Sequence, residues 1–247
     1  MSSGAPTIVS LNPCADAILA EVTEQGQLLA ISHYSQQSGS SSMPLAQAAR
    51  YATTGGTAEE VLALAPDIVV ADAFLAPSTR AALERAGVQV ELLGIVATPE
   101  ESSEQVRRLA ALAGNAQGAE ALVTRIELAW DEAAFEGGPT SALLWQQGGI
   151  VPGEGTLATA MLEQAGFSSH SAARGLRQGA YLPLEQVLAD PPQVVLAAGE
   201  QRMLAHPVLR HLEGVRYETL DASMLYCGGP TIPRALERLS EIRESLQ

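Results

Sequence analysis

Two segments half a chain apart have closely similar sequences. Residues 57–71 read TAEEVLALAPDIVVA and residues 183–197 read PLEQVLADPPQVVLA, so seven of the fifteen aligned positions are identical. Each copy predicts a short helix with an acidic residue in its first turn, a proline that ends the helix, and an aliphatic run typical of a parallel strand covered on both faces. One supersecondary unit used twice predicts two similar lobes, because a chain of 247 residues has the size at which single cores split.

Strand-like and helix-like segments alternate along the rest of the chain. In addition to the aliphatic runs of the two copies, we predict strands at residues 7–11, 28–32, 88–93, 142–145 and 215–220. Helices are predicted at residues 78–86, 98–113, 156–165, 207–212 and 233–245. Residues 35–55 are rich in Ser, Gln and Gly and are predicted to form a loop.

The longest periodic segment lies between the two halves. Apolar residues at helical spacing over residues 116–135 predict one helix of about 30 Å. We therefore predict an α/β protein with an N-terminal lobe at 1–114, a connecting helix at 115–138 and a C-terminal lobe at 139–247. Each lobe is predicted to be Rossmann-like with a mainly parallel sheet.

The charge of the chain excludes several kinds of partner and chemistry. The 28 acidic and 14 basic side chains give a net charge of −14, which argues against nucleic acid or an anionic membrane surface as a partner. Every basic residue is arginine, so Schiff-base chemistry, pyridoxal phosphate attachment and a lysine-bearing phosphate loop are excluded. Residues 1–7 read MSSGAPT and show no secretion signal, so we expect any signal peptide to lie outside this sequence.

Five pieces of the sequence together resemble a known family. They are VSLNP at 9–13, ISHYS at 31–35, Glu59 followed by LAPDIVVA at 64–71, the glycine-rich segment 148–155, and LEQVL at 184–188. In this order and spacing they are similar to substrate-binding proteins of ABC importers, in the cluster whose two lobes are joined by one long rigid helix. The resemblance therefore implies that the helix between the two lobes of this chain is rigid. Members of that cluster carry vitamin B12, haem or ferric siderophores. The resemblance covers essentially the whole chain and is closest to the vitamin B12-binding members.

The resemblance implies a periplasmic solute receptor that makes or breaks no bond. Such a protein captures a metal chelate between its lobes and delivers it to an ABC permease. We expect a corrinoid such as cobalamin first, and a ferric siderophore or haem next. The metal belongs to the ligand, so no cofactor of the protein itself is expected, and the protein is expected to be a monomer that binds no nucleic acid.

The repeated glutamates Glu59 and Glu185 have two interpretations. In the family, one acidic residue on each lobe docks onto arginines of the two permease subunits, and these glutamates stand at the matching positions. Carboxylate–arginine pairs are geometrically selective, which suits such docking. Alternatively, both are first-turn acids that stabilise helix starts by roughly 0.3–1 kcal/mol each. Their presence in both copies favours docking.

The ligand site is predicted from aromatic residues near strand ends, where open α/β sheets bind their ligands. A tyrosine that contacts cobalamin in the family falls at Tyr34. The other candidates are Phe74, Trp145, Tyr181 and Tyr226. Such rings suit a broad, flat and largely apolar ligand. Family members that bind cobalamin have tryptophans near the positions of Gly55 and Asp72, and this chain has none there. The difference argues against cobalamin itself but leaves the class of ligand unchanged.

Cys14 and Cys227 lie in predicted strand-end loops of opposite lobes and are expected to face the ligand site. Three interpretations remain open: a disulfide between the lobes, two thiols that contact the ligand, and two unrelated cysteines.

Two other functions are weighed against the chelate receptor. A hydrolase that uses Cys14 and His33 as a nucleophile and base has no visible third residue to orient the base. A free zinc or manganese receptor of the same fold would use histidines, but His33, His170, His206 and His211 lack the spacing of a helical metal pair. We therefore predict no catalytic residue and no metal site of the protein's own.

Overall fold

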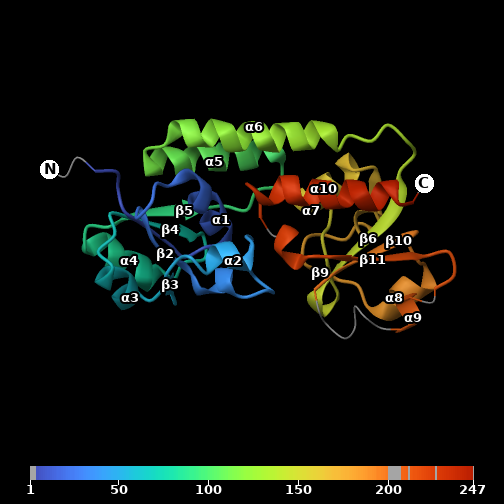
Figure 1. Cartoon of the computed structure of the whole chain (residues 1–247). Coiled ribbons are helices and arrows are strands. Elements are labelled where there is room, and N and C mark those ends of the chain that lie inside the picture. Colours follow the sequence, from blue (N-terminus) through green and yellow to red (C-terminus); the bar gives the residue numbers. More distant parts are fainter. Residues whose placement is uncertain (1–3, 200–206, 211, 226, 247) are drawn as a thin grey trace. The chain divides into compact units, whose positions relative to one another are not determined.

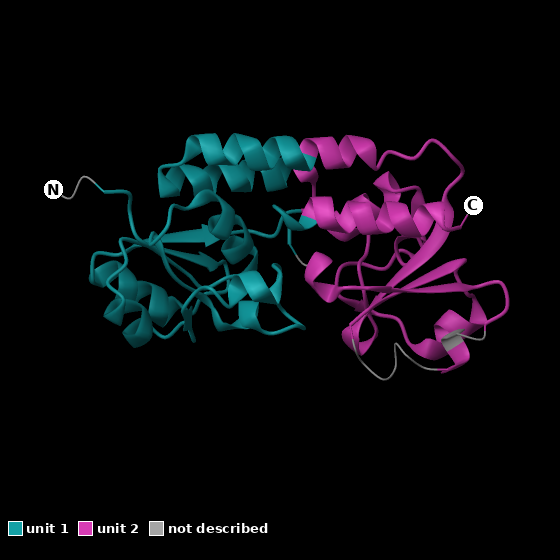
Figure 2. Ribbon diagram, viewed as in Figure 1, with its two compact units in different colours: residues 1–96, 100–126, 226–231 teal, residues 97–99, 127–225, 232–247 magenta. Residues whose placement is uncertain are grey.

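The computed structural model describes residues 4–199, 207–210, 212–225 and 227–246. The chain divides into two compact units, shown in Figure 2. Unit 1 comprises Met1–Val96, Glu100–Ile126 and Tyr226–Thr231, and unit 2 comprises Ala97–Pro99, Glu127–Leu225 and Ile232–Gln247. Residues 226–231, which we predicted to lie in the C-terminal lobe, thus group with unit 1.

Unit 1 is built on a five-stranded parallel sheet in the order β3-β2-β1-β4-β5 (Figure 1). Its strands are β1 (Ile8–Ser10), β2 (Leu28–Ser32), β3 (Thr53–Thr54), β4 (Ile68–Asp72) and β5 (Gln89–Leu93). The strand order reverses between β1 and β4, which makes this the topological switch point of a doubly wound sheet. The loops that follow the strands all lie at one edge of the sheet because the strands are parallel.

Helices connect these strands and complete the core of unit 1. They are α1 (Pro13–Val22), α2 (Leu45–Ala48), α3 (Ala58–Ala63), α4 (Pro77–Arg85), α5 (Pro99–Ala113) and the 3₁₀ helix η1 (His33–Gln36). One core cluster joins Val9, Val69 and Val61 from the two central strands and α3. Residues 35–55, predicted as a loop, contain α2 and β3, and their Ser41, Ser42 and Met43 are buried.

Unit 2 has a four-stranded parallel sheet in the order β11-β10-β6-β8 and a separate antiparallel pair of β7 and β9. Its strands are β6 (Thr140–Gln146), β7 (Ile150–Val151), β8 (Phe167–Ser169), β9 (Ala180–Tyr181), β10 (Val194–Ala198) and β11 (Arg216–Leu220). Its helices are α7 (Leu157–Gln164), α8 (Leu184–Ala189), α9 (Pro207–Arg210) and α10 (Thr231–Glu244). The prediction of two α/β lobes with mainly parallel sheets is confirmed.

The two copies of the repeated sequence form the same structure in the two units. The first copy is α3 and β4, and the second is α8 and β10. Val61 and Val187 are both fully buried, as are Val69 and Val195. Identical residues therefore fill the same places in the two cores, which accounts for their repetition.

The long helix α6 (Ala116–Glu132) begins in unit 1 and ends in unit 2. Its predicted apolar stripe is buried at Ala119, Leu122, Val123 and Ile126. The helix ends at Glu132, before the predicted residue 138, and beyond it the backbone N–H of Phe135 donates to Gln164 O at 3.3 Å and not to a carbonyl of α6. No helix within the described ranges is long and apolar enough to cross a membrane.

Candidate ligand pocket of unit 1

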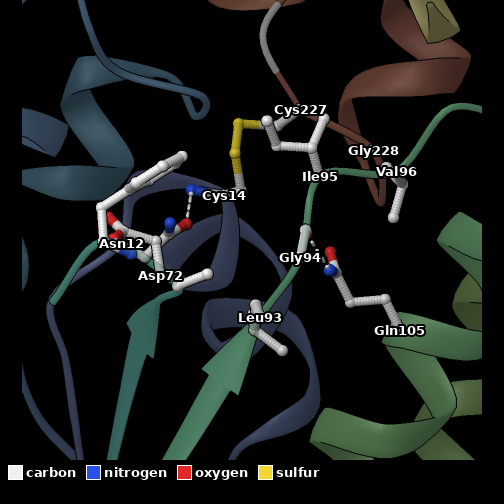
Figure 3. Close-up of a pocket in the computed structure, with 12 residues that line it drawn as sticks. Asn12, Cys14, Asp72, Leu93, Gly94, Ile95, Val96, Gln105, Cys227 and Gly228 are labelled. Carbon is white, nitrogen blue, oxygen red and sulfur yellow. Dashed lines mark hydrogen bonds between the residues drawn. A yellow bond between two sulfur atoms is a disulfide. The ribbon is translucent and has the colours of Figure 1, made fainter.

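The carboxyl edge of the sheet in unit 1 contains a cavity of about 250 Å³ (Figure 3). Loops after β1, β4 and β5 supply most of the lining, and α5 and the segment at Cys227 supply the rest. The lining residues are Asn12, Cys14, Asp72, Ala73, Phe74, Leu93, Gly94, Ile95, Val96, Gln105, Cys227 and Gly228. The strands on both sides of the switch point therefore end at one pocket, which is the place where doubly wound sheets bind ligands.

Side chain to backbone hydrogen bonds shape the loops of this pocket. Asn12 caps α1, since its Oδ1 accepts from the N–H groups of Cys14 at 2.8 Å and Ala15 at 3.1 Å. Asp72 Oδ1 accepts from the N–H of Phe74 at 2.7 Å, which closes a tight turn after β4. Gln105 Nε2 donates to Gly94 O at 3.1 Å and ties the loop after β5 to helix α5. The polar atoms of the pocket thus fix its backbone.

Two apolar side chains of the pocket are strongly exposed. Phe74 is 83% exposed and Ile95 is 70% exposed, although both are large hydrophobic residues. Phe74 is one of the aromatic residues predicted for the ligand site. An exposed apolar rim around a concave site is typical of a surface that binds a hydrophobic partner or ligand.

The two cysteines form a disulfide, which decides between the three interpretations left open by the sequence. Cys14 and Cys227 are bonded across 213 residues of sequence, with 5.1 Å between their Cα atoms. Both belong to unit 1, so the bond does not link the two compact units. Both also line the pocket with Phe74, so three of the predicted site residues lie together. A bonded Cys14 has no thiol to act as a nucleophile.

Tyr34 lies in η1 and does not line this cavity. Its side chain is 50% exposed, and its ring lies 4.0 Å from the ring of His33. The turn is fastened to the core by the buried Asp16, whose Oδ2 accepts from Ser32 N at 3.0 Å and from Ser35 Oγ at 2.6 Å. Burial raises the pKa of the Asp16 carboxyl from 3.8 to about 7, although its hydrogen bonds act in the opposite direction.

The remaining aromatic candidates belong to the C-terminal half of the chain. Trp145 is fully buried in the core of unit 2 and donates its indole N–H to Leu182 O at 3.1 Å, so it packs in the interior. Tyr181 is 60% exposed in β9 and its ring lies against Gly149. Tyr226 lies outside the described residues.

Glu59 and Glu185 occupy the first turns of α3 and α8, and both are exposed. Within the described residues neither carboxylate has a hydrogen bond or ion pair. The adjacent Glu60 differs, because its Oε2 accepts from Thr54 Oγ1 at 2.9 Å and from Gly55 N at 2.6 Å. Glu60 therefore stabilises its own loop, whereas the charges of Glu59 and Glu185 face solvent.

The histidines do not gather with other metal ligands in the described part of the chain, where no group of three or more His, Cys, Asp or Glu side chains is placed to hold a metal ion. His170 is buried at the end of β8, its Nδ1 lies 3.3 Å from Ser141 Oγ, and burial lowers its pKa. His33 Nδ1 lies 3.3 Å from Thr54 O. His206 and His211 lie outside the described residues.

Nine of the twelve residues that line the pocket were not predicted as site residues, among them Ile95 and Gln105. Ile95 follows β5 in a short loop. Phe74 was predicted because it is an aromatic residue near a strand end, and extending that criterion to large aliphatic residues would have found Ile95. Gln105 lies in the middle of α5, and only the fold brings it to Gly94.

Comparison with known proteins identifies related sequences and structures. The model of a family described as periplasmic binding protein matches residues 8–218. No curated protein matches the chain. The fold is similar to that of the periplasmic haem-binding protein RhuT from Roseiflexus sp. RS-1, with 22% identity, a TM-score of 0.78 and 98% of both chains covered.

Two proteins of Vibrio cholerae with different ligands are similar to nearly the same degree. The haem-binding protein HutB is 18% identical, with a TM-score of 0.75 over 96% of this chain and 98% of the other. The vitamin B12-binding protein BtuF is 19% identical, with a TM-score of 0.76 over 98% of this chain and 97% of the other. At these identities the similarity shows the fold and leaves the ligand open.

Proposed function

Because this chain belongs to the family of periplasmic binding proteins, we propose that it is an extracytoplasmic receptor for a metal-containing tetrapyrrole, the class that includes haem and the corrinoids. It acts as a monomer without a cofactor of its own and delivers its ligand to an ABC permease. The metal arrives and leaves with the ligand.

The observation that supports this class most strongly is the pocket at the carboxyl ends of β1, β4 and β5, with the exposed side chains of Phe74 and Ile95. An exposed aromatic ring contacts a flat macrocycle over a large area. The cavity of about 250 Å³ lies below the roughly 300–1,000 Å³ typical of pockets that enclose a whole ligand. It therefore suits one edge of a tetrapyrrole and is too small for the complete ring system.

The lining favours a chelate over a bare metal cation. Among the described residues, no histidine lines this cavity, and the one lining carboxylate, Asp72, already accepts the N–H of Phe74. Zinc and manganese sites need three or more nitrogen, oxygen or sulfur ligands around one point. A ligand that brings its metal already coordinated needs only shape and apolar contact from this surface.

Delivery to the permease is assigned to Glu59 and Glu185. Their carboxylates are exposed in equivalent places of the two units, and within the described residues they form no internal pairs. Arginine side chains on a partner would bind such carboxylates with two parallel hydrogen bonds each.

A thermal-shift panel tests the proposal. Haemin, cyanocobalamin, a ferric hydroxamate siderophore and zinc chloride are added separately to the oxidised protein. A tetrapyrrole at 100 times its dissociation constant stabilises the fold by about 2.7 kcal/mol, and we expect this for haemin or cyanocobalamin. Stabilisation by the siderophore or by zinc, with none by either tetrapyrrole, would contradict the proposed class.

A further inference from the structure

A short segment of the C-terminal half is fastened into unit 1. Residues 226–231 belong to unit 1, whereas Leu225 before them and Ile232 after them belong to unit 2. Cys227 is bonded to Cys14 in the first turn of α1. The residues on either side of this segment belong to unit 2, so the disulfide is its covalent attachment to unit 1.

Hydrogen bonds between this segment and the residues Ser42 and Ser102 reinforce the attachment. Ser42 Oγ donates to the Sγ of Cys227 at 2.7 Å, and Thr231 Oγ1 donates to Ser42 O at 3.4 Å. The backbone N–H of Gly229 donates to Ser102 Oγ at 2.7 Å. Ser42 and Ser102 are both buried, so these contacts lie inside the unit and not on its surface.

The packing at Gly228 and Gly229 leaves no space for a side chain. A Cβ added at Gly228 would collide with Ser102 Oγ and would lie 3.0 Å from Val96 Cγ2. A Cβ at Gly229, which has a φ of +65°, would lie 2.6 Å from Ile18 Cγ1. The backbone of residues 228 and 229 therefore lies directly against side chains of unit 1.

The same segment forms part of the pocket. Cys14, Cys227 and Gly228 line it beside Ile95 (Figure 3). Phe74 also belongs to the lining. The disulfide is uncharged and forms one wall, while strand-end loops form the others. A wall that is fixed before the ligand arrives avoids the entropic cost of ordering it on binding.

We propose that the Cys14–Cys227 disulfide is a positioning element of the ligand site. It holds residues 227–231 as a wall of the pocket, so the site has its binding shape only while the bond is intact. The effect of the disulfide on ligand binding rests on the proposed function. Its effect on the position of residues 227–231 does not depend on any ligand.

The first test needs no ligand. Amide hydrogen exchange is compared between the oxidised wild type and the Cys14→Ser/Cys227→Ser double variant. We expect peptides that cover residues 227–231 to exchange about tenfold faster in the variant, while β1 and β4 remain protected. Equal exchange of the segment in the two proteins would overturn the positioning role, whatever the protein binds.

The second test measures dissociation constants of haemin and cyanocobalamin. We expect the double variant to bind the tetrapyrrole about tenfold more weakly than the oxidised wild type. An unchanged affinity with a loosened segment would show that this wall does not serve the ligand and would overturn the inference. If the oxidised wild type binds neither probe, the proposed function fails, and the exchange experiment alone then upholds or overturns the positioning role.

A third protein separates the position of the wall from general loss of stability. Gly228→Ala keeps the disulfide, but its methyl group displaces the segment from Ser102 and Val96. The matched control is Gly138→Ala, because an added Cβ there has no atom within 4 Å. We expect weaker tetrapyrrole binding in Gly228→Ala and unchanged binding in the control. Unchanged binding in both would overturn the inference even if the double variant failed to fold.

Discussion

Asn12 and Asp72 each accept the N–H of the residue two positions further along the chain, at 2.8 and 2.7 Å. Each side chain thereby fixes a turn that follows a strand, one after β1 and one after β4. The turn after β4 leaves Phe74 largely exposed. At the scale of single residues, the polar side chains of the pocket define its shape and the apolar ones remain available for contact.

Replacing Phe74 with alanine should weaken tetrapyrrole binding by about 1–3 kcal/mol, because the contact area of one aromatic ring is lost. Isothermal titration calorimetry measures the change, and the free energy of unfolding should stay nearly constant because the ring is 83% exposed. Leu128→Ala serves as the control, since Leu128 is a 56% exposed apolar residue on α6 outside the pocket. The same affinity in wild type and Phe74→Ala would place the ligand elsewhere.

Asp16 should make stability depend on pH. Burial raises its pKa from 3.8 to about 7. Between these two pH values, the folded protein therefore keeps a proton that the unfolded chain has lost. The stabilisation linked to this proton is complete below pH 3.8 and is lost as the pH rises to about 7.

Asp16→Asn stays neutral, so its stability relative to the wild type should grow by a few kcal/mol between pH 4 and 7. Urea unfolding of both proteins across that range measures the difference. A difference that does not change with pH would show that the carboxyl of Asp16 titrates normally.

The repeated helix–strand unit shows how far similar sequence determines similar structure. The buried valines of α3 and α8 match, but the turns after the helices differ. Ala65 has a φ of +48°, whereas the matching position in the second copy is Pro191, whose ring fixes φ near −65°. Asp190 just before it has a φ of −144°. The repeat therefore predicted both elements, while it did not predict that the first copy ends in a left-handed residue.

Ala65→Gly should stabilise the protein by a few tenths to about 1 kcal/mol. The left-handed conformation costs alanine roughly 1–2 kcal/mol, and the greater freedom of glycine in the unfolded chain offsets part of the gain. Ala81→Gly, on the exposed face of α4, is the opposite control and should cost about 1 kcal/mol. Urea midpoints that fall in both variants would rule out relief of strain at Ala65.

Two kinds of element could not be predicted from the sequence: very short strands, and segments that are buried by contacts with residues far away in the chain. The strands β3, β7 and β9 have two residues each, which is too short for any periodicity to appear. Two of the buried serines of residues 35–55 are paired with residues outside the segment: Ser35 with Asp16, and Ser42 with Cys227 across 185 residues. Local composition therefore predicted a loop there, and only the fold supplies the hydrogen bonds that bury it.

For the whole molecule, the repeat, the long helix and the order of the segments were sufficient to predict the two α/β units. The assignment of residues 226–231 was not predictable, because a disulfide and two closely packed glycines place them in unit 1. Pairing of Cys14 with Cys227 could be proposed from the sequence but not decided, since it depends on a distance that only the fold sets.

Reversing the charges of Glu59 and Glu185 to arginine should abolish uptake and leave ligand affinity unchanged. Both carboxylates are exposed, on helices α3 and α8, and neither residue is among those that line the pocket. Uptake of radiolabelled tetrapyrrole into vesicles that contain the permease measures the effect. Glu127→Arg on α6 is the matched control, because Glu127 is an exposed acidic residue of another helix. Full uptake with both reversals present would contradict docking through these residues.

The most direct test of the central claim is a map of ligand-induced protection from amide hydrogen exchange. The oxidised protein is measured alone and saturated with whichever of haemin and cyanocobalamin binds more tightly. We predict slower exchange in the segments 12–15, 72–75 and 93–96, which lie at the carboxyl ends of β1, β4 and β5 and contribute to the pocket lining. Saturation with no protection in these three loops would contradict the assignment of the pocket as the tetrapyrrole site.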